Sequence, residues 1–147
     1  MNEQETCNAF VLPALDRGGW SIDQIRPQFH INNGAISPTL KRHSVARPLV
    51  ADYVLEVSPD LPIGVVEAKR TRINAADGIE QAKRYALKLG LPFAFATNGL
   101  TIYEIDLHNP QMREIAQFPS PDELWARYTQ AEDITTPLGQ SLLRAPY

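Results

Sequence analysis

Residues 64–69 read Gly-Val-Val-Glu-Ala-Lys, an apolar run whose last positions carry an acid and a base. Side chains two apart along a strand point to the same face, so Glu67 and Lys69 lie on one face and Ala68 on the other. The pattern is typical of a buried strand that reaches an edge or a cleft at its end, with both charged groups on the same side.

A second run rich in β-branched and aromatic residues, 49–57, precedes this strand and contains Asp52. The breaker Ser58-Pro59-Asp60-Leu61-Pro62 separates the two runs, which predicts paired strands over residues 49–57 and 63–69. Because the strand lengths on either side of the turn are similar, pairing would bring Asp52 and Glu67 within reach of one cation.

The N-terminal residues 3–17 carry apolar side chains at helical spacing, which predicts an amphipathic helix that stops at Gly18-Gly19. Pro13 lies inside this pattern and is expected to kink the helix or to restart it. The segment that follows has one strand-like stretch at residues 28–31, and the turn-forming residues after it predict a mobile loop.

The remaining elements are expected as a helix over residues 75–89, strands over 93–97 and 101–106, and a helix from 120 through 128. Asn74 is a plausible N-cap and Gly90 a stop for the first helix. A two-residue Asn98-Gly99 turn is expected between the two strands. The helix between strands 63–69 and 93–97 favours their parallel pairing, so the predicted fold class is α/β, with a mixed central sheet flanked by helices.

Composition restricts the class of protein. The chain has 147 residues, 44% of them hydrophobic and 21% charged, which indicates one globular domain over residues 1–147. No stretch is apolar enough to span a membrane and no secretory signal is present, so a cytoplasmic protein without a membrane partner is expected. Cys7 is the only cysteine, which excludes an internal disulfide.

The formal net charge of −3 argues against binding of nucleic acid by the whole surface, because such domains are usually strongly basic. Any contact with nucleic acid must be local. Two basic clusters are candidates, although each is equally compatible with a solvated charged face: Lys41, Arg42, His43 and Arg47, and Lys69, Arg70 and Arg72.

The residue types at the paired strands suit hydrolysis of a phosphodiester. That reaction needs an aligned water and neutralisation of the charge that builds on the phosphate, and Mg²⁺ is commonly held by one or two carboxylates plus waters and phosphate oxygens. Lys69 could orient or deprotonate the water, or stabilise the developing charge. From spacing alone, a structural ion pair between Glu67 and Lys69 explains the pattern as well.

The sequence resembles the PD-(D/E)xK nuclease superfamily and, within it, the N-terminal domain of the R subunit of type I restriction endonucleases. The match covers nearly the whole chain. The segments that carry it are Glu3-x-x-Thr6, Pro13-x-Leu15, Gly19-Trp20, Asp52-Tyr53, Val65-Val66-Glu67-Ala68-Lys69, Ala76-Asp77-Gly78-x-x-Gln81-x-x-x-Tyr85-Ala86 and Phe95-Ala96-Thr97-Asn98-Gly99. One departure is Ala51, where the family usually has a proline before the aspartate.

The resemblance implies a role for each matching residue. Asp52 and Glu67 would bind Mg²⁺, and Lys69 would be the catalytic lysine. Gln81 and Tyr85, which share a helix face, would assist them near the scissile phosphate. The family also places a metal-binding glutamate on the first helix, a position that Glu3 fits better by its spacing than Glu5.

The resemblance further implies a restriction-endonuclease-like fold and Mg²⁺-dependent cleavage of double-stranded DNA, with modification and specificity subunits as partners. A helicase-type motor that uses ATP would follow in a longer chain, since no Gly-x-x-x-x-Gly-Lys-Ser/Thr phosphate loop occurs here. Two alternatives stay open: a non-catalytic assembly or DNA-clamping module on the same fold, and a stand-alone resolvase or repair nuclease.

Overall fold

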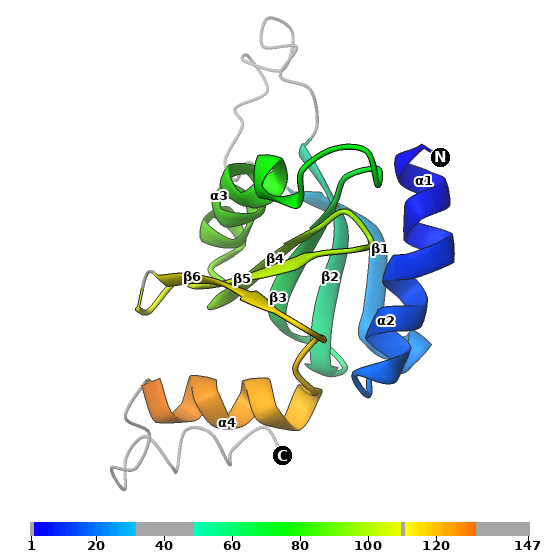
Figure 1. Cartoon of the computed structure of the whole chain (residues 1–147). Coiled ribbons are helices and arrows are strands. Elements are labelled where there is room, and N and C mark those ends of the chain that lie inside the picture. The colour runs from blue at the N-terminus through cyan, green and yellow to red at the C-terminus, as the bar shows by residue number, and fades with distance from the viewer. Residues whose placement is uncertain (1, 32–48, 110, 132–147) are drawn as a thin grey trace, which may run out of the picture.

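The computed structural model describes residues 2–31, 49–109 and 111–131, and its centre is a mixed sheet of six strands in the order β1-β2-β3-β4-β5-β6 (Figure 1). The strands are β1 (Ile25–Ile31), β2 (Leu49–Ser58), β3 (Leu61–Ala68), β4 (Phe93–Thr97), β5 (Ile102–Asp106) and β6 (Gln111–Ile115). Neighbouring strands are antiparallel except β3 and β4, which are parallel as predicted.

The helical elements lie before, between and after the strands. They are α1 (Glu3–Thr6), η1 (Cys7–Val11), α2 (Leu12–Arg17), η2 (Ile22–Gln24), η4 (Ala75–Gly78), α3 (Ile79–Leu89) and α4 (Pro121–Ala131). The helix predicted over residues 75–89 is confirmed, although its first turn is the 3₁₀ helix η4. Asn74 caps it by accepting a hydrogen bond from the N–H of Ala76, and Gly90 ends it in the left-handed conformation.

The predicted N-terminal helix is present as one run of α1, η1 and α2 that ends at Gly18. Pro13 does not break it. The turn just before the proline is π-helical, and the N–H of Leu12 donates to the carbonyl of Cys7, five residues back. A wider turn accommodates a proline, which has no N–H to donate and whose ring crowds the preceding turn.

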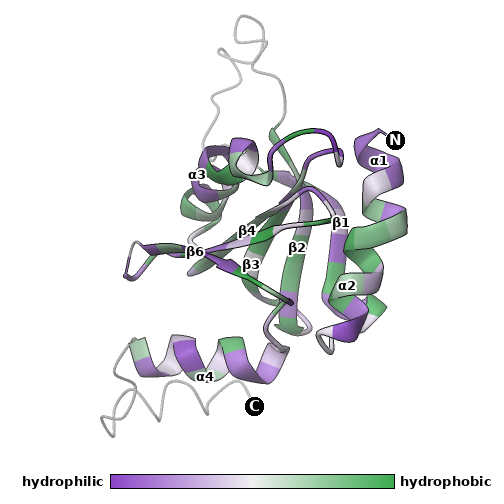
Figure 2. Cartoon of the chain, viewed as in Figure 1, coloured by the Kyte–Doolittle hydropathy of each residue, from purple (hydrophilic) through white to green (hydrophobic). Residues whose placement is uncertain are grey.

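Two apolar clusters cover the two faces of the sheet. The N-terminal helical run and α4 pack on one face, around large buried side chains such as Trp20 and Phe95. On the other face, Ala82 and Ala86 of α3 pack against strand residues such as Val65. Figure 2 shows the hydrophobic strands enclosed between these layers. The central strands are therefore buried on both sides, which explains why β3 and β4 read as nearly continuous apolar runs.

The β4–β5 hairpin is confirmed, but its predicted two-residue turn is wrong. Thr97 pairs with Ile102, so four residues, 98–101, form the loop. Asn98 Oδ1 accepts hydrogen bonds from the N–H groups of Leu100 at 3.0 Å and Thr101 at 2.9 Å. The Asn98 side chain thus accepts the hydrogen bonds of two N–H groups that would otherwise need backbone acceptors, and this stabilises a loop of four residues.

The edge strand β6 was not predicted, and β1 is longer than the stretch 28–31. β6 is exposed along almost its whole length, so its sequence lacks the apolar alternation that marks a half-buried strand. It is defined by its pairing with β5. Such a strand depends on its neighbour for its conformation, because isolated strands are not stable in water.

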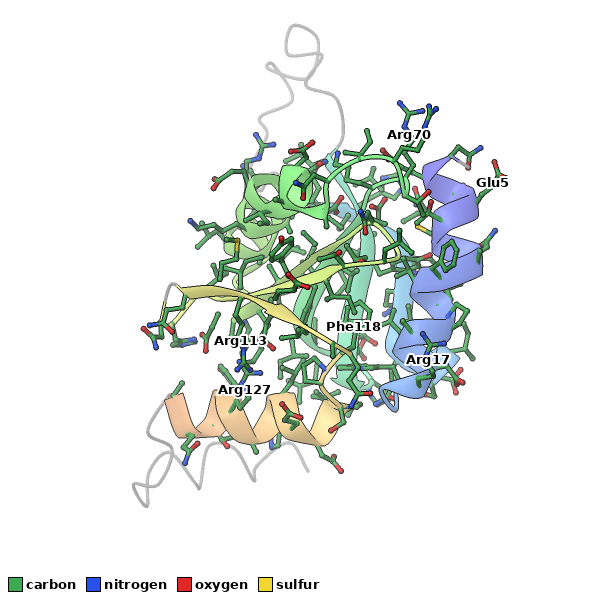
Figure 3. The ribbon with its side chains drawn as sticks, in the orientation of Figure 1. Glu5, Arg17, Arg70, Arg113, Phe118 and Arg127 are labelled. Carbon is green, nitrogen blue, oxygen red and sulfur yellow. The ribbon has the colours of Figure 1, made fainter. Side chains whose placement is uncertain are left out.

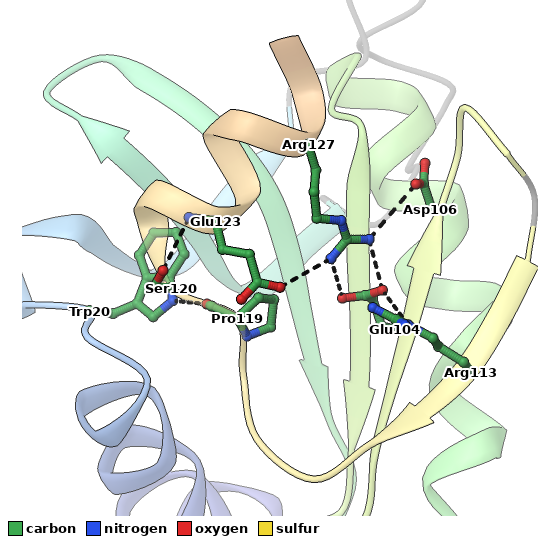
Figure 4. A network of polar contacts seen from close by, with 8 residues as sticks. All are labelled: Trp20, Glu104, Asp106, Arg113, Pro119, Ser120, Glu123 and Arg127. Carbon is green, nitrogen blue, oxygen red and sulfur yellow. Dashed lines mark hydrogen bonds and ion pairs between the residues drawn. The ribbon is translucent and has the colours of Figure 1, made fainter. Parts of the chain in front are cut away.

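The C-terminal helix α4 is tied to the rest of the fold by polar contacts (Figure 4). Its predicted N-cap is confirmed, since Ser120 Oγ accepts a hydrogen bond from the N–H of Glu123 at 3.1 Å. Trp20 Nε1 donates to the carbonyl of Pro119 at 2.9 Å, and Arg127 binds Glu104 of β5 through both terminal nitrogens, at 2.8 and 2.9 Å. The N-terminal helical run and α4 thus share one packed face.

Two parts of the sequence-based expectations lie outside the described residues: the loop with its basic cluster at residues 41–47, and the tail from residue 132. Among the described residues, no helix is long and apolar enough to cross a membrane.

Candidate active site

Asp52 and Glu67 meet at a fork in the sheet. The β2–β3 ladder runs as far as the pair Tyr53 and Val66, and beyond it β2 stays paired with β1 while β3 stays paired with β4. At the fork, the N–H of Asp52 donates to Glu67 Oε1 at 3.0 Å, and the N–H of Ala68 donates to Asp52 Oδ2 at 2.8 Å. Each carboxylate therefore takes the place of a backbone acceptor on the neighbouring strand.

Both acids point to the side of the sheet that α3 covers. Asp52 precedes Val54 by two residues and Glu67 follows Val65 by two, and these valines belong to the apolar cluster around α3. Ala68 belongs to the cluster on the opposite face. The predicted division of side chains between the two faces of β3 is thus confirmed.

The carboxyl of Glu67 is almost enclosed, with 3% of the residue exposed, whereas Asp52 is half-buried. Burial, followed by the negative charge of Asp52, raises the pKa of Glu67 to about 9. The positive charge of Lys69 opposes this rise of the pKa without cancelling it. Glu67 therefore keeps its proton near neutral pH, and a cation bound beside this carboxyl would favour loss of the proton.

Lys69 is held in position by α3. Its ammonium Nζ donates to Gln81 Oε1 at 3.4 Å, and Gln81 Nε2 donates to the hydroxyl of Tyr85 at 2.8 Å. Its aliphatic chain crosses Gly78, because a Cβ built at this glycine would lie 3.6 Å from Lys69 Cγ. Gln81 and Tyr85 are four positions apart and so lie on one helix face, from which α3 supplies two polar side chains that continue the chain of hydrogen bonds from Lys69.

The loop after β3 is fixed by Asn98, which the sequence places in a turn without indicating a contact with this loop. Asn98 Nδ2 donates to the carbonyl of Ile73 at 2.8 Å, and the carbonyl of Thr97 accepts from the N–H of Lys69 at 2.7 Å. These contacts bind residues 69–73 to the end of β4. The only sequence signal was the asparagine itself, whose side-chain amide can serve both its own turn and a second segment.

The predicted third acid does not join the pair in a cluster. Among the described residues, no three histidine, cysteine or acidic side chains lie close enough together to hold a metal ion. Glu3 is exposed on α1, near enough for its charge to act on Cys7. Burial, helped by the carboxylates of Asp52 and Glu3, raises the pKa of the Cys7 thiol. A role for Glu3 or Glu5 in metal binding stays a prediction.

Comparison with known proteins gives matches of one kind. Residues 23–91, which include the fork and α3, match the family model described as the second domain of the EcoKI type I restriction enzyme endonuclease subunit. The chain is 33% identical over 148 aligned residues to the EcoAI type I restriction enzyme endonuclease subunit of Escherichia coli. The chain is thus similar in sequence to endonuclease subunits of type I restriction enzymes.

A solved structure extends this relationship with R subunits to the fold. The fragment described as an HsdR subunit of a type I restriction enzyme from Vibrio vulnificus YJ016 superimposes with a TM-score of 0.79 at 35% identity, over 90% of this chain. The R-subunit relatives are much longer: the chain spans 18% of the EcoAI subunit and 26% of the Vibrio chain. The chain thus resembles the N-terminal region of an R subunit.

The donor set at the fork fits a hard divalent cation. Asp52 Oδ2 and Glu67 Oε1 each accept one backbone hydrogen bond, which orients both carboxylates, and their second oxygens are the candidate ligands. Carboxylate oxygens are the ligands that Mg²⁺ prefers, and one or two of them usually suffice when water and phosphate complete the shell. Burial and then the negative charge of Asp52 raise the pKa of Glu67, and a cation bound between the carboxylates would oppose that rise of the pKa.

Proposed function

We propose that this chain is the nuclease domain of a type I restriction enzyme R subunit and hydrolyses phosphodiester bonds of double-stranded DNA. The observation that supports this most is the carboxylate pair at the fork, with Lys69 beside it. Asp52 and Glu67 would hold Mg²⁺, which when bound supplies positive charge to the phosphate and lowers the pKa of a coordinated water.

The protein's own residues then have separate tasks. Asp52 and Glu67 are oriented by backbone N–H groups, so their free oxygens are fixed before a ligand arrives. Lys69, held by Gln81, orients the attacking water or stabilises the charge on the phosphate. Tyr85 accepts a hydrogen bond from Gln81 and keeps its amide turned toward Lys69. Tyr85 and Gln81 are in this sense positioning residues.

The proposed function also includes a motor domain and partner subunits. An R subunit of full length would add an ATP-driven motor, and modification and specificity subunits would select the DNA. The net charge of −3 fits a nuclease that binds DNA weakly until those partners deliver it.

Metal binding is the first test, because it does not require the motor. Mn²⁺ would be titrated by calorimetry into the 147-residue chain and into the Asp52→Asn and Glu67→Gln variants, with Glu114→Gln as a control. Glu114 lies exposed on β6 and undergoes the same chemical change as Glu67. The proposal expects one site, lost in both fork variants and kept in the control.

Absence of a site, even with short duplex DNA present, would favour the non-catalytic module. Cleavage of branched DNA by the chain alone would favour a stand-alone resolvase or repair nuclease instead.

A further inference from the structure

The basic side chains of the described residues fall into two groups. Those of the first group are paired: Arg26 with Glu56 at 3.2 Å, and Arg113 and Arg127 with Glu104 at 3.0 and 2.8 Å. The second group forms no ion pair within the described residues and consists of Arg17, Lys69, Arg70, Arg72, Lys83, Arg84 and Lys88. All of the second group except Arg17 lie on the loop after β3 or on α3, the two segments that border the carboxylate pair.

Two exposed cations of this second group lie on the same face of α3 as Gln81, which holds Lys69. Arg84 and Lys88 follow Gln81 by three and seven residues, so they extend the helix face that holds Lys69. The rise between Gln81 and Lys88 is about 10 Å. That length corresponds to about three phosphates of one DNA strand, which are about 3.4 Å apart along the axis.

Arg84 packs against a ring, and the loop that carries Arg70 and Arg72 is closed by a backbone hydrogen bond, but none of these cations forms an ion pair among the described residues. The guanidinium of Arg84 lies 5.9 Å from the centre of the Tyr85 ring. Glu80, four residues before Arg84, makes no ion pair with it among the described residues. The loop that carries Arg70 and Arg72 is closed by a 2.9 Å hydrogen bond from the N–H of Ile73 to the carbonyl of Arg70. Figure 3 shows Arg70 extending from the end of the molecule opposite Arg113 and Arg127.

We infer that these exposed cations, on the loop after β3 and on α3, form one binding surface for the phosphate backbone of duplex DNA next to the carboxylate pair. This surface, here named the phosphate track, consists of Arg70, Arg72, Arg84 and Lys88. The inference rests on the proposed nuclease function and adds the contacts that hold the substrate. Duplex DNA fits better than an acidic protein surface, because the spacing along α3 suits successive phosphates and the cations flank a site built for a phosphodiester.

The test measures binding of a short fluorescent DNA duplex by anisotropy, in EDTA and at increasing KCl concentrations. All proteins carry Glu67→Gln, so the duplex stays intact and binding does not depend on metal. Arg72→Ala and Arg84→Ala are compared with Arg17→Ala. Arg17 is an exposed arginine at the end of α2 that forms no ion pair among the described residues, and it lies away from Arg70 in Figure 3, so its removal is the matched control.

Each track variant is expected to lower the slope of log binding constant against log salt by about 0.9, the value for one lost phosphate contact, while Arg17→Ala keeps the parent slope. Equal losses for Arg17→Ala and Arg84→Ala would overturn the track. A parent protein that binds no duplex at low salt would also overturn the phosphate track. Polyglutamate serves as a model of an acidic protein surface, and track variants that bind DNA normally but lose binding to polyglutamate would likewise overturn it. Failure of the Mn²⁺ titration would instead overturn the nuclease function, because this DNA assay contains no metal.

Discussion

The N–H of Asp52 donates a 3.0 Å hydrogen bond to Glu67 Oε1, so the backbone of one acid holds the side chain of the other. The N–H of Ala68 returns the contact by donating to Asp52 Oδ2 at 2.8 Å. The two carboxylates thus close the end of the β2–β3 ladder and also form the candidate cation site. Substitutions at this fork are therefore expected to affect stability and metal binding in different ways.

Glu67→Gln is expected to stabilise the metal-free protein, increasingly so as pH rises. The folded-state pKa of Glu67 is raised from 4.5 to about 9, so between these values the unfolded chain loses a proton that the folded protein keeps. Stability from this group is therefore highest below about 4.5 and falls as pH rises through that window. Glutamine keeps an oxygen to accept from Asp52 and has no charge to bury.

Thermal unfolding in EDTA at several pH values measures this effect. The melting temperature of Glu67→Gln should exceed that of the parent by a margin that grows with pH, while Glu114→Gln follows the parent. Parallel pH profiles for Glu67→Gln and the parent would show that the buried carboxyl carries no such penalty.

Lys69→Ala is expected to lower cleavage of plasmid DNA by an R-subunit complex by about 100-fold or more, the usual loss when one stabilising or proton-transferring group is removed. Mn²⁺ binding should remain, because the carboxylates keep their backbone contacts. Tyr85→Phe removes the acceptor for Gln81 Nε2 and should produce a smaller loss of the same kind. Loss of Mn²⁺ binding in either variant would contradict the separation of these tasks.

Arg127→Ala is expected to destabilise the fold by about 3 kcal/mol, because it removes a partner of the buried Glu104 carboxylate. The Arg127 guanidinium also lies 4.9 Å from the centre of the Phe93 ring. Arg113→Ala is the comparison: its side chain is 62% exposed, against 25% for Arg127, so its loss should cost about 1 kcal/mol or less. Urea unfolding gives both values, and equal losses would contradict the central role of Arg127.

Acid should weaken the same network. Burial raises the pKa of Glu104, but the hydrogen bonds and charges of Arg127 and Arg113 outweigh it and hold the pKa below its ordinary value of 4.5. The stabilisation is therefore complete above about 4.5 and is lost as pH falls through the lower folded-state pKa. Glu104→Gln should remove this acid-dependent part of the urea midpoint, and an unchanged acid profile in that variant would assign it to other groups.

Gly99→Ala is expected to destabilise the protein more than Gly90→Ala. Both glycines have positive φ, +89° and +70°, which costs about 1 to 2 kcal/mol for alanine. Only at Gly99 would the added Cβ meet another residue, with Phe10 Cβ at 3.0 Å, whereas nothing lies within 4 Å at Gly90. Adding Phe10→Ala should cancel the difference in a double-mutant cycle, and additive losses would mean that strain alone explains it.

The sequence by itself determined the fold class, the pairing of β2 with β3, the parallel pairing of β3 with β4 and the helix between them. These features follow from local patterns: apolar runs, caps and breakers whose meaning does not depend on distant residues. The alternation along β3 also predicted that Glu67 and Lys69 share a face, and α3 indeed brings Gln81 to Lys69 at 3.4 Å. The family resemblance supplied the roles of these residues.

Only the tertiary structure decided the rest. The fork that fixes Asp52 against Glu67 depends on where β2 leaves β3, which is set by their other neighbours β1 and β4. The sequence of β6 lacks a strand pattern, and β6 is a strand because it pairs with β5. The side chain of Asn98, in the wide turn, donates a hydrogen bond to the carbonyl of Ile73, 25 residues away in the sequence. A raised pKa at Glu67 likewise arises from burial between layers. These properties depend on contacts between segments that are distant in the sequence, and local sequence patterns contain no information about those contacts.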